Sequence, residues 1–355
     1  MKNLGKKATT RALWAQAMLA AAAVSGCGVL PRARMGSLAA PTIGTPFLDP
    51  GNMGAHSYGY LRAPFEKNGI VYTCRGGSID ITHLRWNADY TRFLVNRTRG
   101  TLMKTGNRFS FNLAFEPSTH CVRFHYPDNW DSLSKDQKEE IADAVAFAVG
   151  PYLAYNATMW HEILTWFGTH FIAVEPEFNS AFSWEDTFSN LLGTHLAIRA
   201  MKDKEHSYDR ALTLALNEEL AALGDQPRHA AVDAVEKMRG HWFSGNFAVH
   251  TYRRNFDMGL DDGCVTAVLI PDAADCQGQP ASYPAWTLDL LTQYGVSLTY
   301  EIKPNVMEQG KIFRAAGGSR IYPEAHFPIL LDYIRSQAAE LGHLFDQRQA
   351  YFGSE

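Results

Sequence analysis

The sequence predicts a single α+β domain with a central bundle of about five helices flanked by short strands and hairpins. Three observations predict this fold class. Helix start and stop signals recur through the middle of the chain, β-branched and aromatic runs lie on both sides of it, and no linker-like composition interrupts residues 51–355. The chain has 355 residues, which is enough to bury a large core.

The central helices are predicted from their boundary residues. Ser134 and Gln137 form a capping-box pattern before the first helix, and Gly150 with Pro151 should separate it from the second. Ser183 should cap the third helix, and glycines follow the later ones. The five predicted helices cover residues 138–149, 152–167, 184–201, 208–223 and 227–239.

The flanking elements are shorter. Short runs rich in β-branched and aromatic residues look like strands, and one further helical run lies near each end of the domain. The predicted strands are 69–74, 265–271 and 295–302, the predicted hairpin pairs 108–116 with 120–126, and the flanking helices are 82–97 and 328–341.

The first 50 residues should not belong to the domain. Four basic residues precede the apolar run "ALWAQAMLAAAAVSG" (12–26), which is the pattern of a secretory leader. The run ends in "VSGC", which resembles the bacterial lipobox, so Cys27 is expected to be acylated after cleavage. We therefore predict a lipoprotein signal peptide over 1–26 and a flexible tether over 27–50.

Charge limits the classes of partner. Removal of the leader takes away four positive charges and no negative ones, so the formal net charge changes from −4 to −8. An acidic body argues against nucleic acid and against a polybasic membrane contact, so the membrane partner is expected through the N-terminal lipid. Gly28 follows Cys27 where an aspartate would resemble an inner-membrane retention signal, which favours the outer membrane, facing the periplasm.

The stretch "MWHEILTWFGTH" (159–170) is the main chemical signal. His161 and Glu162 begin the zinc-peptidase pattern H-E-x-x-H, in which histidines bind the metal and the glutamate accepts a proton from water. Thr165 stands where the second histidine should be. The pattern therefore predicts an incomplete site for zinc or another divalent metal, with Glu162 as the catalytic base.

Other segments must supply the missing ligands. Glu185 follows the His-Glu pair at about the spacing at which related peptidases place a ligating glutamate on the next helix. His83, near Asp80 at the start of an apolar helix, is the first candidate for a third ligand, and Asp186 is the second. The alternative is a buried network in which His161 hydrogen-bonds Glu185 or Asp186 without metal.

The cysteines suggest disulfides. Apart from Cys27 there are four, Cys74, Cys121, Cys264 and Cys276, in a compartment that permits oxidation. Four cysteines allow three pairings, and nearness in sequence favours Cys74 with Cys121 and Cys264 with Cys276. A reactive Cys74 thiol paired with His83 as base is the alternative.

Two classes of function remain open on these residues. One is a metal-dependent hydrolase that acts on a peptide or cell-wall substrate of the envelope. The other is a non-catalytic envelope scaffold or binding lipoprotein in which the same His, Glu and Asp residues form a buried network.

Four motifs carry a family resemblance. They are "YTCRGGSIDITHLRWNADYTRFL", "WHEILTWFG", "FSWEDTFSNLLGTH" and "RRNFDMGLDDG", in that order along the chain. Together they resemble a family of bacterial envelope lipoproteins defined by a domain of unknown function. The resemblance implies a one-domain envelope protein and transfers no catalytic residue.

Overall fold

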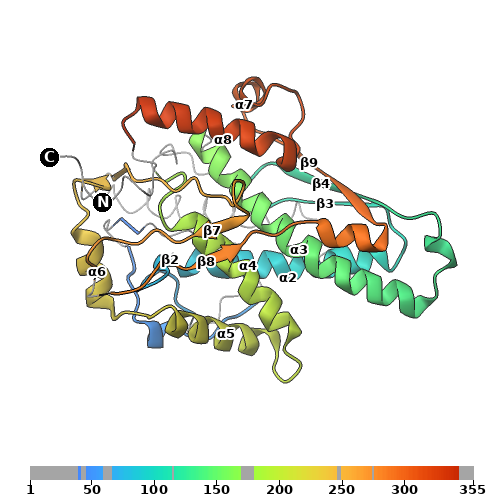
Figure 1. Cartoon of the computed structure of the whole chain (residues 1–355), viewed down its shortest axis with the longest axis horizontal. Coiled ribbons are helices and arrows are strands. Elements are labelled where there is room, and N and C mark those ends of the chain that lie inside the picture. The colour runs from blue at the N-terminus through green and yellow to red at the C-terminus, as the bar shows by residue number, and fades with distance from the viewer. Residues whose placement is uncertain are drawn as a thin grey trace, which may run out of the picture.

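The computed structural model of the chain describes residues 39–40, 45–58, 66–113, 116–168, 180–245, 249–273 and 276–343. The predicted signal peptide and Cys27 lie outside these residues. The described part is an α+β domain in which long helices occupy the centre and small antiparallel sheets surround them (Figure 1), as the sequence predicted.

Three long helices form the centre: α2 (Ile81–Leu102), α3 (Lys135–Trp166) and α4 (Asp186–Lys202). Helix α2 packs along both of the others, and its ribbon runs behind α3 and α4 in Figure 1. Their facing side chains belong to one large hydrophobic core that also takes in α5 and α8. The prediction of a central helical bundle is therefore confirmed.

Two glycines permit the close approach of these helices. A Cβ atom at Gly150 of α3 would lie 2.3 Å from Val95 Cγ2 of α2, and one at Gly193 of α4 would lie 2.1 Å from the carbonyl oxygen of Leu84. Any larger residue would force the helices apart. Because Gly193 brings α4 against the first turns of α2, it also brings together the polar residues at the two helix starts.

The predicted break at Gly150 and Pro151 is wrong, because α3 is one continuous helix through Pro151. A proline inside a helix removes one backbone hydrogen bond and crowds the preceding turn. Gly150 and Pro151 are both buried, and the packing of α3 against α2 outweighs the local cost. The predicted Ser134 capping box is present.

The other helices follow the predictions closely, with one addition. The runs predicted at 208–223, 227–239 and 328–341 are helical, although the last begins five residues earlier, at Pro323. Helix α7 was not predicted. These helices are α5 (Tyr208–Ala222), α6 (Arg228–Glu236), α7 (Gln309–Ala316) and α8 (Pro323–Glu340), with 3-10 turns η1 (Pro50–Asn52), η2 (Trp130–Ser132) and η4 (Asp289–Tyr294).

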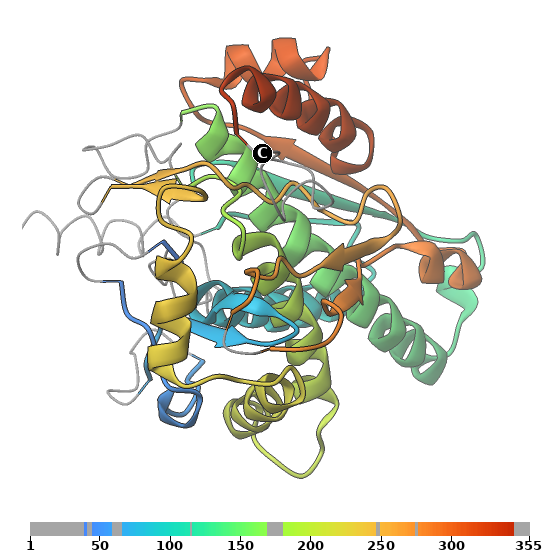
Figure 2. The same ribbon diagram turned by 60° about the vertical axis from the view of Figure 1, so that its left-hand side comes forward.

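The largest sheet of the described residues has three antiparallel strands in the order β3-β4-β9. The predicted hairpin is present, with Val122 opposite Phe109, and the predicted strand near 295–302 adds to it with Tyr300 opposite Val122. Helix α8 lies over β9, and α7 packs beside α8 at the same edge of the molecule (Figures 1 and 2). The three strands are β3 (Arg108–Phe111), β4 (Thr119–His125) and β9 (Ser297–Lys303).

Three two-stranded sheets complete the described part. The β1-β2 hairpin leads directly into α2, and its second strand was not predicted. The strand predicted at 265–271 is shorter, because only Cys264–Thr266 pair with a neighbour. These strands are β1 (Ile70–Thr73), β2 (Gly77–Asp80), β5 (Phe243–Ser244), β6 (His250–Thr251), β7 (Cys264–Thr266) and β8 (Ser282–Pro284).

Part of the predicted tether packs on the domain. Ala39, Ala40 and Phe47 are buried in a second hydrophobic cluster, and Phe47 forms a β-bridge with Ile70. The described residues between 39 and 50 therefore lie against the body and do not form a free linker. Within the described ranges, no helix has both the length and the apolar character of a membrane span.

Candidate metal centre

Asp80 is held at the junction of strand and helix. It ends β2 and serves as the N-cap of α2, where its Oδ1 accepts hydrogen bonds from the backbone N–H groups of Thr82, at 2.6 Å, and His83, at 3.3 Å. An aspartate is favoured at an N-cap because it satisfies amides that lack a helical partner. With Oδ1 engaged in this way, Oδ2 faces the side chain of His83.

Asp186 is held in a similar way at the start of α4. The hydroxyl of Ser183 donates to Asp186 Oδ2 at 2.7 Å. The predicted role of Ser183 as a helix cap is therefore only partly right, since its hydroxyl binds the side chain of Asp186, and α4 begins at Asp186. This hydrogen bond leaves Asp186 Oδ1 directed toward α2.

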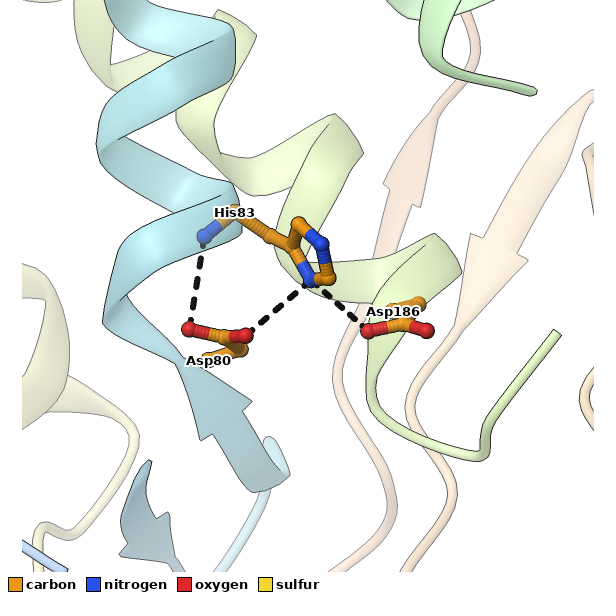
Figure 3. Close-up of side chains that lie close together, drawn as sticks. All are labelled: Asp80, His83 and Asp186. Carbon is orange, nitrogen blue, oxygen red and sulfur yellow. Dashed lines mark hydrogen bonds and ion pairs between the residues drawn. The ribbon is translucent and has the colours of Figure 1, made fainter. Parts of the chain in front are cut away.

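His83, in the first turn of α2, joins the two carboxylates (Figure 3). Its Nδ1 lies 3.1 Å from Asp80 Oδ2 and 2.8 Å from Asp186 Oδ1. One ligand atom from each of the three buried residues lies within 4.8 Å of the others, so they form a group that could hold a metal ion. Atoms bound to one cation at about 2.1 Å lie roughly 3.0–3.4 Å apart, close to these separations.

The electrostatics of the group favour a cation between the carboxylates. Burial alone would lower the pKa of His83, but the carboxylates of Asp186 and Asp80 outweigh it and raise the pKa well above its ordinary value. In the absence of metal, a proton on His83 takes the place of the cation. The same three side chains therefore suit either an imidazolium or a divalent ion.

Glu185, predicted as a ligand, lies beside the group and is not one of its three members. Its side chain is buried, its Oε1 accepts a hydrogen bond from the backbone N–H of Ala39 at 2.6 Å, and its Oε2 has no hydrogen-bond partner among the described residues. Burial, reinforced by the charge of Asp186, raises the pKa of this carboxyl well above its usual range. Glu185 is therefore a buried acid with one oxygen available next to Asp186.

His161 and Glu162 also lie near the group without joining it. The indole ring of Trp86 stacks on His83 at 6.3 Å and meets the edge of His161 at 6.0 Å. Burial lowers the pKa of His161 to about 4, so this imidazole is neutral at neutral pH. Glu162 Oε2 accepts a hydrogen bond from the backbone N–H of Phe182 at 2.7 Å.

A buried arginine completes the surroundings. Burial lowers the pKa of Arg254 to about 10, and the charges of Glu162, Asp186 and Glu185 oppose that shift. Its guanidinium donates to the carbonyl oxygen of Ala181 and lies 5.8 Å from the centre of the Trp166 ring. Arg254 thus supplies positive charge on the side of the acidic residues that faces the end of α3.

The predicted disulfide pairs are wrong. The disulfide joins Cys74 to Cys276, with a Cα–Cα distance of 4.9 Å, while Cys121 and Cys264 are free. Cys121 lies in the middle of β4, opposite Ser110 and Glu301, so the sheet holds it away from the β1-β2 turn that carries Cys74. The observed disulfide also excludes Cys74 as a free nucleophile.

Sequence reasoning named His83 and Asp186 as candidate ligands and mentioned Asp80 only as a neighbour of His83. The signal for Asp80 is local. An aspartate at a helix N-cap and a histidine three residues later lie on the same side of the first turn, so their side chains can meet.

Comparison with known families identifies the larger part of the chain. Residues 32–260 match the family described as "Protein of unknown function (DUF4056)", and the chain belongs to this family. Asp80, His83 and Asp186 all lie within the matched region. Neither a curated protein nor a solved structure matches the chain.

Proposed function

We propose that this DUF4056 domain binds one divalent metal ion through Asp80, His83 and Asp186. The convergence of Asp80 Oδ2, His83 Nδ1 and Asp186 Oδ1 carries the proposal. The other carboxylate oxygens of Asp80 and Asp186 each accept a protein hydrogen bond, which is how surrounding residues usually orient metal ligands. Two carboxylates and one imidazole suit zinc, manganese or iron.

The proposed activity is hydrolysis of a peptide or cell-wall substrate of the bacterial envelope. When bound, a divalent cation supplies Lewis-acid activation of water and carbonyl groups. A carboxylate near the ion must then accept a proton. Glu162 was predicted for this role from the His-Glu pair, and Glu185 is the second candidate because its Oε2 has no hydrogen-bond partner among the described residues.

Matched variants test the activity. Protein purified without chelator is assayed on peptidoglycan fragments, with Asp186→Asn, Glu162→Gln and Glu185→Gln measured in parallel for both turnover and bound metal. Asp186→Asn should lose both. Loss of turnover with retained metal identifies the base. Turnover that persists in Asp186→Asn, or wild-type protein that binds metal but cleaves no fragment, would contradict the hydrolase.

The proposed location is the periplasmic face of the outer membrane, through a lipid on Cys27. The basic and apolar leader followed by "VSGC" supports this proposal. Cys27→Ser should abolish acylation and move the protein from the membrane fraction to the soluble fraction. A variant that fractionates like the wild type would refute the anchor.

A non-catalytic binding lipoprotein is the second candidate. It is favoured by a second buried histidine of this chain, His56, which bridges the carboxylates of Glu66 and Asp89 through its two ring nitrogens. On this alternative, His83 is a protonated bridge of the same kind. Purified protein would then contain no metal, and adding divalent ions would not stabilise it.

A further inference from the structure

A hollow in the surface lies between α7, α8 and the end of α3. Its lining residues on α7 and α8 follow the region matched by the family, and those at the end of α3 lie within it. The volume of the hollow is about 690 Å³, within the range of roughly 300–1,000 Å³ that is usual for ligand pockets. We call it the α7–α8 groove. Trp166 and Phe167 line it at the end of α3, Lys311 and Arg314 on α7, and Tyr333 with Gln337 on α8.

Aromatic rings form one wall of the α7–α8 groove. The rings of Phe167 and Tyr333 stack at 5.7 Å with an interplanar angle of 3°. Tyr333 and Leu341, which line the groove, are two of the five large hydrophobic side chains that are exposed among the described residues. Exposed apolar side chains that line a hollow are typical of binding surfaces.

The polar groups of the α7–α8 groove are a set joined by hydrogen bonds, two cations, and the carboxylate of Glu340. Trp166 Nε1 donates to Gln337 Oε1 at 3.0 Å, and Gln337 Nε2 donates to Tyr333 Oη at 3.1 Å, so these groups satisfy one another. Lys311 and Arg314, both exposed, form no ion pair within the described residues. The groove therefore offers two cations and the carboxylate of Glu340 beside an aromatic wall, on a protein whose formal net charge is −4.

We propose that the α7–α8 groove binds an acidic peptide segment. Carboxylates of the peptide pair with Lys311 and Arg314, and an aromatic or branched side chain packs on Phe167 and Tyr333. The concave shape favours a chain segment over a flat bilayer surface. This inference is independent of the metal site.

A short labelled peptide of four glutamates and one phenylalanine tests the proposal by fluorescence anisotropy on the full-length protein. Its counterpart with glutamines in place of the glutamates is the ligand control. The double variant Lys311→Gln/Arg314→Gln should bind the acidic peptide about five- to tenfold more weakly. Glu340→Gln removes the carboxylate that lines the groove and should tighten binding about twofold.

The matched protein control is Lys104→Gln/Lys204→Gln, which removes two exposed cations elsewhere. It should bind like the wild type, and the thermal unfolding of all variants should coincide. Equal binding of the glutamine peptide, equal weakening in the control variant, or no binding to the wild type would each overturn the proposal. The proposal would also be overturned if the peptide did not bind and Lys311 and Arg314 were instead required for binding to anionic vesicles or for self-association.

Discussion

Two buried histidines, His56 beside helix α2 and His83 in its first turn, each contact two carboxylates, but through different ring atoms. His56 places Nδ1 3.2 Å from Glu66 Oε1 and Nε2 3.0 Å from Asp89 Oδ1. The two acids therefore lie on opposite sides of the imidazole, which acts as a spacer. No single ion could contact both carboxylates and the ring.

His83 instead presents one nitrogen to both of its carboxylates, so three ligand atoms converge on one point. A count of buried His, Asp and Glu residues therefore does not identify a metal site. The carboxylates must also converge on one ring nitrogen, as they do at His83.

We call His56, Glu66 and Asp89 the His56 group. The contacts around this group support a structural role. Arg85 Nε lies 3.6 Å from Glu66 Oε1, and the guanidinium also donates to the carbonyl oxygens of Met53 and Gly54, at 3.2 and 3.1 Å. These contacts tie the described N-terminal residues 45–58 to α2. A positive charge and a histidine thus balance two buried acids, as stable burial requires.

Breaking the His56 group should have the largest effect on stability. His56→Ala leaves Glu66 and Asp89 buried without their common partner, which should cost about 3–5 kcal/mol of unfolding free energy. Urea unfolding in the presence of a chelator measures this loss of unfolding free energy. The control is His125→Ala, because His125 is exposed on β4. A loss below about 1 kcal/mol would mean that the His56 group is not a structural network.

Reduction of the disulfide should have the next largest effect, and it bears on the His83 group. Cys74 lies in the turn before β2, the strand that delivers Asp80. Cys276→Ala should lower the unfolding free energy by about 2–4 kcal/mol. It should also weaken metal binding, because the hairpin that positions Asp80 is less constrained.

Cys121→Ala is the control, since Cys121 is free. Thiol titration of denatured, unreduced Cys27→Ser protein checks the number of disulfides. Two reactive thiols, Cys121 and Cys264, are expected. Four reactive thiols would refute the Cys74–Cys276 disulfide, and none would mean that Cys121 and Cys264 are not free.

Metal should stabilise the protein only through the group formed by Asp80, His83 and Asp186. A ligand present at about 100 times its dissociation constant adds about 2.7 kcal/mol to the unfolding free energy. Zinc or manganese should therefore raise the melting temperature of the wild type and of His56→Gln, and leave that of Asp186→Asn unchanged. An equal rise in all three proteins would indicate nonspecific binding.

The stability of the metal-free protein should depend on pH less strongly than that of the metal complex, and in the opposite direction. The raised pKa of His83 gives stability that is fully present below its unfolded pKa of about 6.5. This stability is lost as the pH rises through the higher folded pKa. A tenfold difference in proton affinity between the folded and unfolded states corresponds to about 1.4 kcal/mol.

With metal bound, the stability should instead rise with pH, because the ligands must be deprotonated. Thermal unfolding from pH 6 to 9, with and without chelator, measures both slopes. His83→Asn should flatten the metal-free slope, whereas His125→Asn should not. A metal-free protein that becomes more stable over this range would contradict the raised pKa of His83.

Sequence reasoning predicted the elements better than their junctions. The helix over 208–223 and the hairpin pairing 108–116 with 120–126 followed from local periodicity and turn residues, which tertiary packing did not override. The break at Pro151 was predicted wrongly because burial against α2 outweighed the helix-breaking preference of the residue.

Only the part of the site that follows from local sequence patterns was predictable. His83 and Asp186 could be named because polar residues at the start of apolar helices stand out in a sequence. Their convergence depends on Gly193, which lets α4 approach α2, and this close contact is visible only in the structure. The Cys74–Cys276 pairing and the His56 group likewise join segments far apart in the chain, which local patterns do not reveal.

The metal content of the protein tests the distinction between the two histidines most directly. The full-length chain is purified without chelator, and zinc, manganese and iron per chain are measured before and after incubation with each ion. About one ion per wild-type chain is predicted, with little in Asp80→Asn or Asp186→Asn and the full amount in Asp89→Asn of the His56 group. Wild-type protein that stays free of metal after incubation, or Asp186→Asn protein that retains it, would contradict a metal centre at His83.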